Sequence, residues 1–382
     1  MAVVQDKTPV TPAAAEWPPQ PPAAGLPQPG TVTRLQFTGQ AGEYFGIWLV
    51  NILLTVVTLG LYGPWAKVRR LRYFYGHTVL AEERFDYTGI PQKILKGRLL
   101  ALGVYLGLTT LGSLSPALAG LGGLVLYLLV PWLLRATYRF TARNSKYRNS
   151  RLVFRGTLVG AVRVYLGWSL LALLSLGLLV PVWMQRHKAY QYNHLSIGQV
   201  PFRLQVSAGD FYRAGGVPLG LLLLGGLLLL GGLARLLWTL AGVSGHGPAL
   251  VQGFDPSGGL VGLGVVLVAV PLLYLLVPLL YHAVRARWFR LVWNGLSVGH
   301  SRFGCDLPTG RYVWVNLINW LGMMVSFGLL TPWAQVRLAR LKVESVGLRW
   351  QDDPEGLLTQ AQQDPSAFAE ELSDLLDLDV SL

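Results

Sequence analysis

The sequence has little charge and almost no cysteine. Only 13% of its 382 residues are charged, about half the ~25% typical of soluble domains. This composition excludes a disordered chain, a coiled coil and an ordinary cytosolic globular protein. The single Cys305 excludes an internal disulfide and a cysteine-based metal cluster. Because 52% of the residues are hydrophobic, we expect a protein that is partly solvated by lipid.

Residues that could support chemistry are also scarce. The apolar segments described below contain no Asp or Glu, which argues against a carboxylate proton relay of the kind that membrane pumps use. The six histidines show no metal-ligand spacing, and residues 1–30 lack the apolar core of a secretory signal peptide. We therefore expect no enzymatic activity, no cofactor and no metal.

Long apolar runs fill the middle of the chain. A membrane-spanning helix needs about 20 apolar residues, and seven segments approach that length, with Gly112 to Pro116 dividing the longest run into a hairpin of two. The sequence therefore predicts a polytopic α-helical membrane protein. The seven segments are 44–64, 97–113, 117–134, 164–183, 217–241, 259–284 and 312–333.

Basic residues lie directly beside these apolar runs. The chain has 32 Lys and Arg against 19 Asp and Glu, a net charge of +13. This placement favours an anionic membrane surface over nucleic acid as the partner. Three regions follow: a disordered Pro- and Ala-rich arm (1–33), a membrane domain (34–350) and an acidic tail (351–382). The tail allows one short amphipathic helix, either solubilising or docking on a protein partner or the chain's own basic face.

An internal repeat links the apolar and basic parts. Three apolar segments end in Gly-Leu-x-x-Pro, followed by a Trp and by an Arg five residues after the proline. Proline is favoured in the first turn of a helix, so each should begin a basic helix at the membrane boundary, with Trp at headgroup depth and Arg facing lipid phosphate. The repeated residues are Gly60, Pro64, Trp65 and Arg69; Gly177, Pro181, Trp183 and Arg186; and Gly328, Pro332, Trp333 and Arg337.

Two further copies of the repeat end in Tyr-Leu-Leu-Val-Pro, at Pro131 and Pro278. A short segment with period-two alternation follows each basic stretch, which is typical of half-buried strands. We predict short β-hairpins on the basic face of the molecule. The segments are Arg84–Tyr87, Leu152–Arg155, Phe202–Val206 and the stretch near Phe303.

Three asparagines are the notable polar residues inside the apolar segments: Asn51, Asn316 and Asn319. In lipid each needs a hydrogen-bond partner, which either a neighbouring helix or a solute can supply.

The first repeat resembles the YjgN family, bacterial inner-membrane proteins built around a domain of unknown function. The resemblance extends over about residues 34–350 and implies a multi-pass protein of the bacterial inner membrane, but it supplies no activity. The residues that carry it are Phe37-x-Gly39, Tyr44-Phe45, Val50-Asn51, the stretch from Thr58 to Ala66, and Arg84-Phe85-x-Tyr87-x-Gly89.

Two functions and two topologies remain open. The first function is a membrane-organising protein that interacts with anionic lipid; the alternative is a small-solute channel or uncoupled transporter. If all seven segments span the membrane, the basic residues divide 20 to 11 between its sides. If segments 44–64, 164–183 and 312–333 instead return to the side they entered, 31 lie on one side. The positive-inside rule prefers this second arrangement, with both tails in the cytoplasm, although re-entrant backbone must not expose unpaired groups to lipid.

Overall fold

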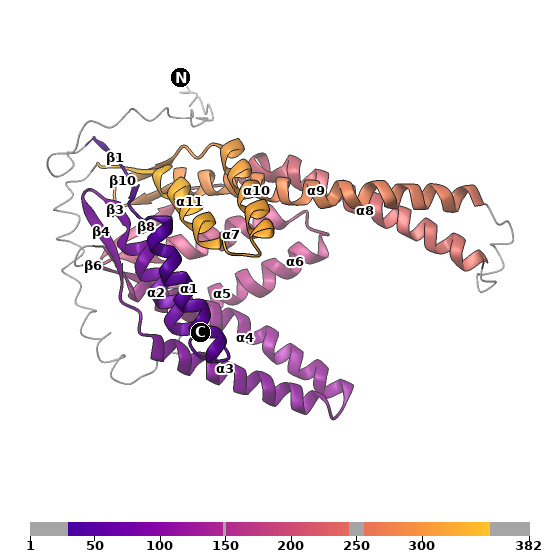
Figure 1. The fold of residues 1–382 in the computed structure, drawn as a ribbon, viewed down its shortest axis with the longest axis horizontal. Coiled ribbons are helices and arrows are strands. Elements are labelled where there is room, and N and C mark those ends of the chain that lie inside the picture. The colour runs from indigo at the N-terminus through magenta and orange to yellow at the C-terminus, as the bar shows by residue number, and fades with distance from the viewer. Residues whose placement is uncertain (1–29, 148–149, 244–255, 352–382) are drawn as a thin grey trace, which may run out of the picture.

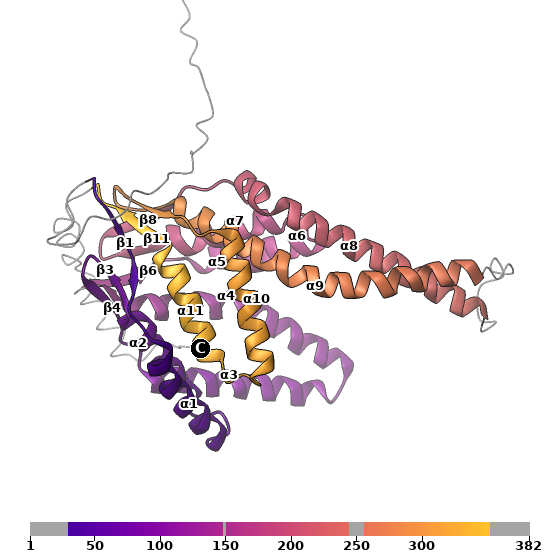
Figure 2. The same cartoon turned by 45° about the horizontal axis from the view of Figure 1, so that its top comes forward.

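The computed structural model describes residues 30–147, 150–243 and 256–351, and Figures 1 and 2 show its ribbon. A helical pair followed by two antiparallel strands occurs four times along the chain, and a fifth helical pair is followed by a single strand. The strands are β1 (Val32–Arg34), β2 (Gln36–Phe37), β3 (Thr78–Leu80), β4 (Glu83–Tyr87), β5 (Ser145–Tyr147), β6 (Ser150–Phe154), β7 (Leu195–Ile197), β8 (Val200–Leu204), β9 (Leu296–Val298), β10 (Ser301–Cys305) and β11 (Val346–Arg349).

A pair of helices precedes every strand pair except β1 and β2, and the helices lie on one side of the sheet (Figure 1). One member of the third pair is continued by a short π-helix, η1 (Arg163–Trp168). The helices are α1 (Ala41–Val57), α2 (Gly63–Gly76), α3 (Pro91–Gly112), α4 (Pro116–Arg143), α5 (Leu158–Val162), α6 (Ser169–Leu174), α7 (Val180–Asn193), α8 (Ala208–Val243), α9 (Pro256–Asn294), α10 (Thr309–Val325) and α11 (Thr331–Glu344).

The strands form one sheet that curls into a barrel-like ring. Every neighbouring pair is antiparallel, and the order runs from β1 through β11 and down to β2. The two end strands, β1 and β2, are consecutive pieces of one chain segment, separated by Leu35, whose N–H donates to the carbonyl of Val346 at 2.9 Å. Joining its two ends in this way removes the exposed edges that an open sheet would present.

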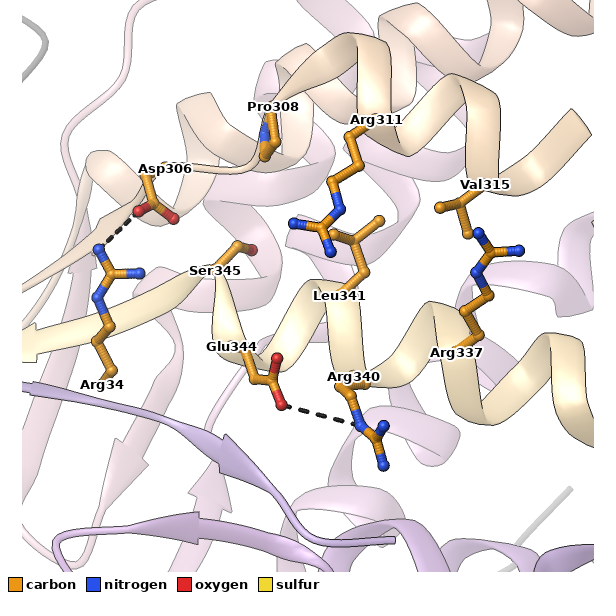
Figure 3. A pocket seen from close by; sticks show the side chains of 10 residues that line it. All are labelled: Arg34, Asp306, Pro308, Arg311, Val315, Arg337, Arg340, Leu341, Glu344 and Ser345. Atoms are coloured by element: carbon orange, nitrogen blue, oxygen red, sulfur yellow. Dashed lines mark hydrogen bonds and ion pairs between the residues drawn. The ribbon is translucent and has the colours of Figure 1, made fainter. Parts of the chain in front are cut away.

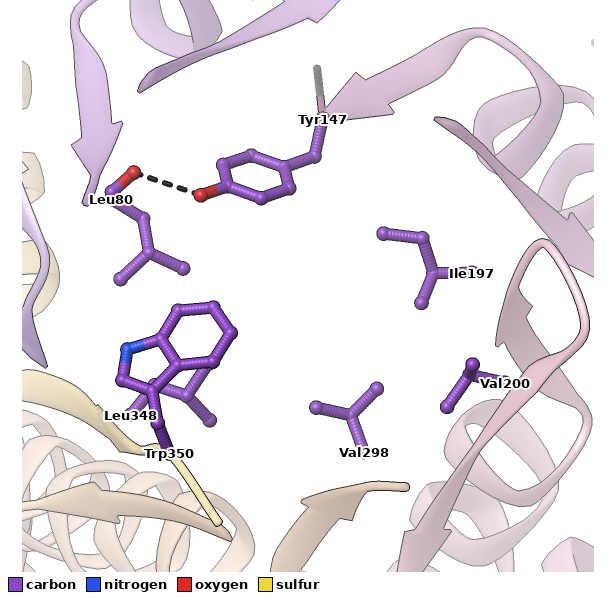
Figure 4. Close-up of a cluster of buried hydrophobic side chains, with 7 residues drawn as sticks. All are labelled: Leu80, Tyr147, Ile197, Val200, Val298, Leu348 and Trp350. Atoms are coloured by element: carbon purple, nitrogen blue, oxygen red, sulfur yellow. Dashed lines mark hydrogen bonds between the residues drawn. The ribbon is translucent and has the colours of Figure 1, made fainter. Parts of the chain in front are cut away.

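Apolar side chains fill the inside of this ring (Figure 4). Phe85 lies opposite Tyr147, Phe202 opposite Val298, and Phe303 opposite Leu348 in the strand register. The phenol of Tyr147 also donates to the carbonyl of Leu80 at 2.9 Å. The buried members of this core cluster are Leu80, Tyr147, Ile197, Val200, Val298, Leu348 and Trp350.

A second layer of buried residues attaches the helices to the ring. In β2, β4, β6, β8 and β10 the last strand residue is buried, and so is the residue seven positions later, in the helix that follows. The strand residues are Phe37, Tyr87, Phe154, Leu204 and Cys305, and their helical partners are Tyr44, Ile94, Ala161, Phe211 and Tyr312. The same packing therefore fixes the base of all five helical pairs.

Among the described residues, four helices are long and apolar enough to cross a membrane: α3, α4, α8 and α9. Four of the seven expected apolar segments, 97–113, 117–134, 217–241 and 259–284, lie in these helices. Segments 44–64, 164–183 and 312–333 are each divided by a turn between two shorter helices. The long pairs α3–α4 and α8–α9 reach furthest from the sheet in Figure 2, whereas the other three pairs are short.

Two other expectations need correction. Pro131 and Pro278 lie inside α4 and α9 rather than at a helix start, because these long helices continue through them. Val32 and Thr33, which the sequence assigned to the arm, are paired in β1. The helix expected in the acidic tail, and the arm up to residue 29, lie outside the described residues.

Candidate functional site: three turns and a basic pocket

The three Gly-Leu-x-x-Pro sequences form turns with nearly the same backbone geometry. Gly60, Gly177 and Gly328 have φ values of +93°, +88° and +88°, in the left-handed region that glycine adopts at no steric cost. Each glycine N–H donates to the carbonyl five residues earlier, at 2.7, 2.9 and 2.8 Å. This is the 6→1 bond with which many helices end.

A hydroxyl two residues before each glycine starts the next helix, a feature that the sequence analysis missed. Thr58, Ser175 and Ser326 each donate to a carbonyl of the helix that is ending. Each hydroxyl oxygen then accepts the N–H four residues later, at 2.9, 3.0 and 3.1 Å. The sequence signal was available, since all three repeats have Ser or Thr at this position and such residues commonly satisfy free amides at helix starts.

As a result, the turns leave no backbone N–H unpaired. In the first turn the amides of residues 59, 60, 61, 62 and 63 all donate within the turn. The equivalent amides, 176–180 and 327–331, do the same in the other two. Paired N–H groups are one condition for placing non-helical backbone near lipid, where the carbonyls must be paired as well.

The tips of these turns are strongly apolar and exposed. Leu59 is 95% exposed, Leu176 76% and Phe327 97%. Two residues further on, Leu61, Leu178 and Leu329 are also exposed. A large apolar surface on three separate tips is unfavourable in water and marks contact with another apolar phase or molecule.

The arginine of each repeat lies in the helix that follows the exposed tip, and it contacts an aromatic side chain. Arg69 donates to the hydroxyl of Tyr62 at 3.2 Å, and the Arg337 guanidinium lies 4.9 Å from the ring centre of Trp333. Arg186 instead lies 5.5 Å from the ring of Trp168 in η1. In all three cases an aromatic side chain contacts the arginine that follows the proline by five residues, through its hydroxyl at Arg69 and through its ring at Arg186 and Arg337.

The rest of the repeat plays a structural role. Pro64, Pro181 and Pro332 begin α2, α7 and α11 as expected, but all three are fully buried. They therefore do not face lipid. Trp183 donates its indole N–H to the carbonyl of Val164 at 3.1 Å and so connects α7 to η1.

The intramembrane asparagines differ from one another. Asn319 is buried and donates from α10 to the carbonyl of Ala334 in α11 at 3.2 Å, which is an interhelical contact. Asn316 donates to Tyr312 within its own helix at 2.8 Å. Asn51 is buried in α1, and its amide oxygen, like that of Asn319, has no partner among the described residues.

A polar network lies between α4, η1 and α7. Tyr165 donates to the hydroxyl of Tyr138 at 2.9 Å, and Gln191 donates to the same hydroxyl at 2.6 Å. The Lys188 ammonium donates to the side-chain carbonyl of Gln191 at 2.9 Å. Burial lowers the pKa of the neighbouring His187 to about 4, assisted by the positive charge of Lys188. His187 is therefore neutral at physiological pH.

A basic pocket opens between α10 and α11, next to β1 (Figure 3). Its volume is about 510 Å³, and its charged lining consists of four arginines and two carboxylates. Arg34 pairs with Asp306 at 2.7 Å, whereas Arg340 lies 3.9 Å from Glu344, at the limit of an ion pair. The charged residues are Arg34, Arg311, Arg337, Arg340, Asp306 and Glu344.

Burial raises the pKa of the Glu344 carboxyl, and the charges of Arg340 and Arg311 offset part of that rise. Arg311 makes no hydrogen bond or ion pair within the part of the chain that the structure describes. The Arg337 guanidinium contacts the ring of Trp333. No group of three His, Cys, Asp or Glu among residues 30–147, 150–243 and 256–351 could hold a metal ion.

The chain is similar to bacterial proteins whose function is unknown. The model of a family described as "Bacterial protein of unknown function (DUF898)" matches residues 32–375. The inner membrane protein YjgN of Salmonella typhimurium (strain LT2) is 38% identical over 96 residues, 25% of this chain and 24% of that protein. YjgN of Escherichia coli (strain K12) is 45% identical over 51 residues, 13% of each chain. The matched stretches thus span a quarter or less of these relatives. No solved structure matches the chain.

Proposed function

The chain belongs to the DUF898 family, and we propose that this protein of the bacterial inner membrane organises the bilayer by holding anionic lipid headgroups, without enzymatic activity. Its three short helical pairs would enter and leave the membrane on the cytoplasmic side. The long pairs α3–α4 and α8–α9 would cross it. The barrel-like sheet would then lie in the cytoplasm.

The observation that carries this proposal is the construction of the three turns. Each turn has an exposed apolar tip, and its backbone N–H groups donate hydrogen bonds within the turn. The usual objection to re-entrant backbone is the free energy of unpaired N–H and C=O groups in hydrocarbon, and the N–H groups of these turns do not incur that cost. Lipid chains are a solvent in which such tips are stable.

The depth of insertion is consistent with a single leaflet. Arg69, Arg186 and Arg337 each follow the proline by five residues, about 8 Å of helix. If their guanidinium groups reach the phosphates, the tips lie within the nearer half of a hydrocarbon core about 30 Å thick. Trp333 and Trp65 would then lie near the headgroups, where amphipathic rings are favoured.

The distribution of charge supports the same orientation. The turn at 113–115, which would face outward, contains no Lys or Arg, and the sequence between α8 and α9 contains none either. Arg235 is the one basic residue of the chain toward the outer end of a long pair. Retention of basic residues on the cytoplasmic side is the general rule for inner-membrane proteins.

The solute-channel alternative has less support. The aromatic and aliphatic residues inside the sheet pack against each other, and such a core disfavours a water-filled path along the ring axis. A path between the helical pairs would remain possible only outside that core. Solute flux in proteoliposomes would favour the channel.

Topology can be tested with cysteine labelling, since the natural Cys305 is buried. Three variants would each add one exposed cysteine: Leu114→Cys, Phe327→Cys and His300→Cys. An impermeant maleimide added outside intact spheroplasts should label only position 114. Labelling of position 300 or 327 from outside would overturn the proposal.

Lipid preference can be tested with the protein reconstituted in vesicles. Spin-labelled phosphatidylglycerol should associate with the protein more strongly than spin-labelled phosphatidylcholine. Removal of two turn arginines, in Arg69→Gln/Arg186→Gln, should weaken that preference by severalfold, because each basic residue near a surface contributes about 1 kcal/mol to anion attraction. Equal association of the two lipids with the wild-type protein would contradict the proposed role.

A further inference from the structure

The pocket between α10 and α11 has an excess of positive charge that no described residue balances. It contains four guanidinium groups and two carboxylates. Arg34 is neutralised by Asp306, and Arg340 is held by Glu344 and by the carbonyl of Gly39, to which it donates at 2.9 Å. Arg311 and Arg337 form no ion pair in the described ranges, although the charge of Arg311 acts on the nearby Glu344 carboxyl.

These two arginines face the same space from different helices. Figure 3 shows Arg311 extending from α10 toward α11, and Arg337 extending from α11 toward Val315 of α10. A planar guanidinium presents several N–H donors in a fixed geometry that matches the oxygens of a phosphate. Two of them on opposite walls of a 510 Å³ cavity can hold a phosphate, in the size range of small-ligand sites.

The other short helical pairs lack this arrangement. Arg311 directly precedes Tyr312, the buried residue that anchors α10 to the sheet. The residue in the same place before Tyr44 in α1 is Glu43, and before Ala161 in α5 it is Gly160. The arginine pair is therefore a property of the fifth helical pair alone among the three short ones, rather than of the repeat.

An apolar path leads away from the pocket toward the membrane. Trp314, Leu321 and Val325 follow Arg311 at intervals that keep them on one face of α10, and all three are exposed. From Arg311 to Val325 the helix rises about 21 Å, somewhat more than one leaflet of hydrocarbon. A ligand with its phosphate on Arg311 and Arg337 would thus meet an apolar surface for its chains.

We propose that this pocket is a specific site for the phosphate of a membrane phospholipid, held between Arg311 and Arg337 with its acyl chains along α10. The inference rests on the proposed function for its orientation, because the pocket must lie at headgroup level on the cytoplasmic side. It adds a single defined site to the general attraction of the three turns.

The test uses the full-length protein in dodecyl maltoside and phosphatidylglycerol with a fluorescent acyl chain. Arg311→Gln/Arg337→Gln should weaken binding at least tenfold, because both phosphate contacts are lost. The control Arg84→Gln/Arg151→Gln removes two exposed arginines from the outside of the sheet and should stay within twofold of the wild type. Circular dichroism and gel filtration establish that each variant is folded.

Competition distinguishes the source of the phosphate. Unlabelled phosphatidylglycerol should displace the probe, while inorganic phosphate and glycerol 3-phosphate at millimolar concentration should not. Displacement by the soluble phosphates would indicate a site for a small phosphate ligand rather than for a lipid, and would overturn the inference.

The failures of the two proposals are distinguishable. Unchanged binding in Arg311→Gln/Arg337→Gln, together with weaker binding in Arg69→Gln/Arg186→Gln, would refute the pocket and leave the proposed function standing. Equal association of anionic and zwitterionic lipid with the wild-type protein would refute the proposed function, and unchanged binding in Arg311→Gln/Arg337→Gln as well would refute both.

Discussion

Two glycines of the first helical pair should respond in opposite directions to the same substitution. Gly60 has φ +93° in the turn, and Gly46 is an exposed residue inside α1. A Cβ added at either position would meet no atom within 4 Å. Any difference between the two alanine variants therefore reports backbone conformation rather than steric overlap.

The magnitudes follow from the backbone. An L-residue in the left-handed region costs about 1–2 kcal/mol, so Gly60→Ala should lower the free energy of unfolding by that amount. Alanine in a helix interior is more stable than glycine by about 0.5–1 kcal/mol, so Gly46→Ala should raise it. The variants should differ by roughly 1.5–3 kcal/mol.

The assay is reversible unfolding by denaturant of the purified protein in mixed micelles, followed by circular dichroism. Gly177→Ala and Gly328→Ala should behave as Gly60→Ala does, because their φ values are alike. Equal stability of Gly60→Ala and Gly46→Ala would refute the left-handed turn. A loss confined to Gly60 would show that the three turns are not equivalent.

Three further predictions concern charge and buried polar groups. Anionic-lipid binding should strengthen as pH falls through the raised pKa of Glu344. Protonation of Glu344 leaves Asp306 as the one carboxylate opposite the four arginines that line the pocket. This strengthening should be absent from Glu344→Gln. The free energy of unfolding should fall by up to about 3 kcal/mol as the pH is lowered from 6.5 to about 4, because His187 stays neutral in the folded protein, with a pKa of about 4, while it is protonated in the unfolded chain. Thermal unfolding of His187→Leu should lack this pH-dependent loss, and that of His300→Gln should retain it. Asn319→Leu should change stability by less than about 1 kcal/mol in denaturant unfolding, because the lost interhelical hydrogen bond is offset by removal of an unpaired buried oxygen; a much larger loss would indicate a bound solute.

The sequence by itself determined the class of the protein and the places where its helices break. Length and spacing of apolar residues are local properties, so the long pairs near 97–134 and 217–284 could be recognised directly. The glycines at 60, 177 and 328 were visible for the same reason, since a left-handed residue is required wherever such a helix ends. The Ser and Thr two positions earlier had an equally local signal that was overlooked.

Only the tertiary structure decided how these parts meet. The closure of the sheet at Leu35 joins strands that lie more than 300 residues apart, Arg34 and Gly347 among them, and no local pattern encodes such a pairing. Arg34 and Asp306 are themselves 272 residues apart in sequence, so the pocket could not be assembled from motifs. The sequence grouped Arg337 with Arg69 and Arg186 as one repeated position, but the helix packed beside it places Arg311 opposite Arg337. Arg69 and the pocket residue Arg337 have the same sequence context and differ only in their neighbours.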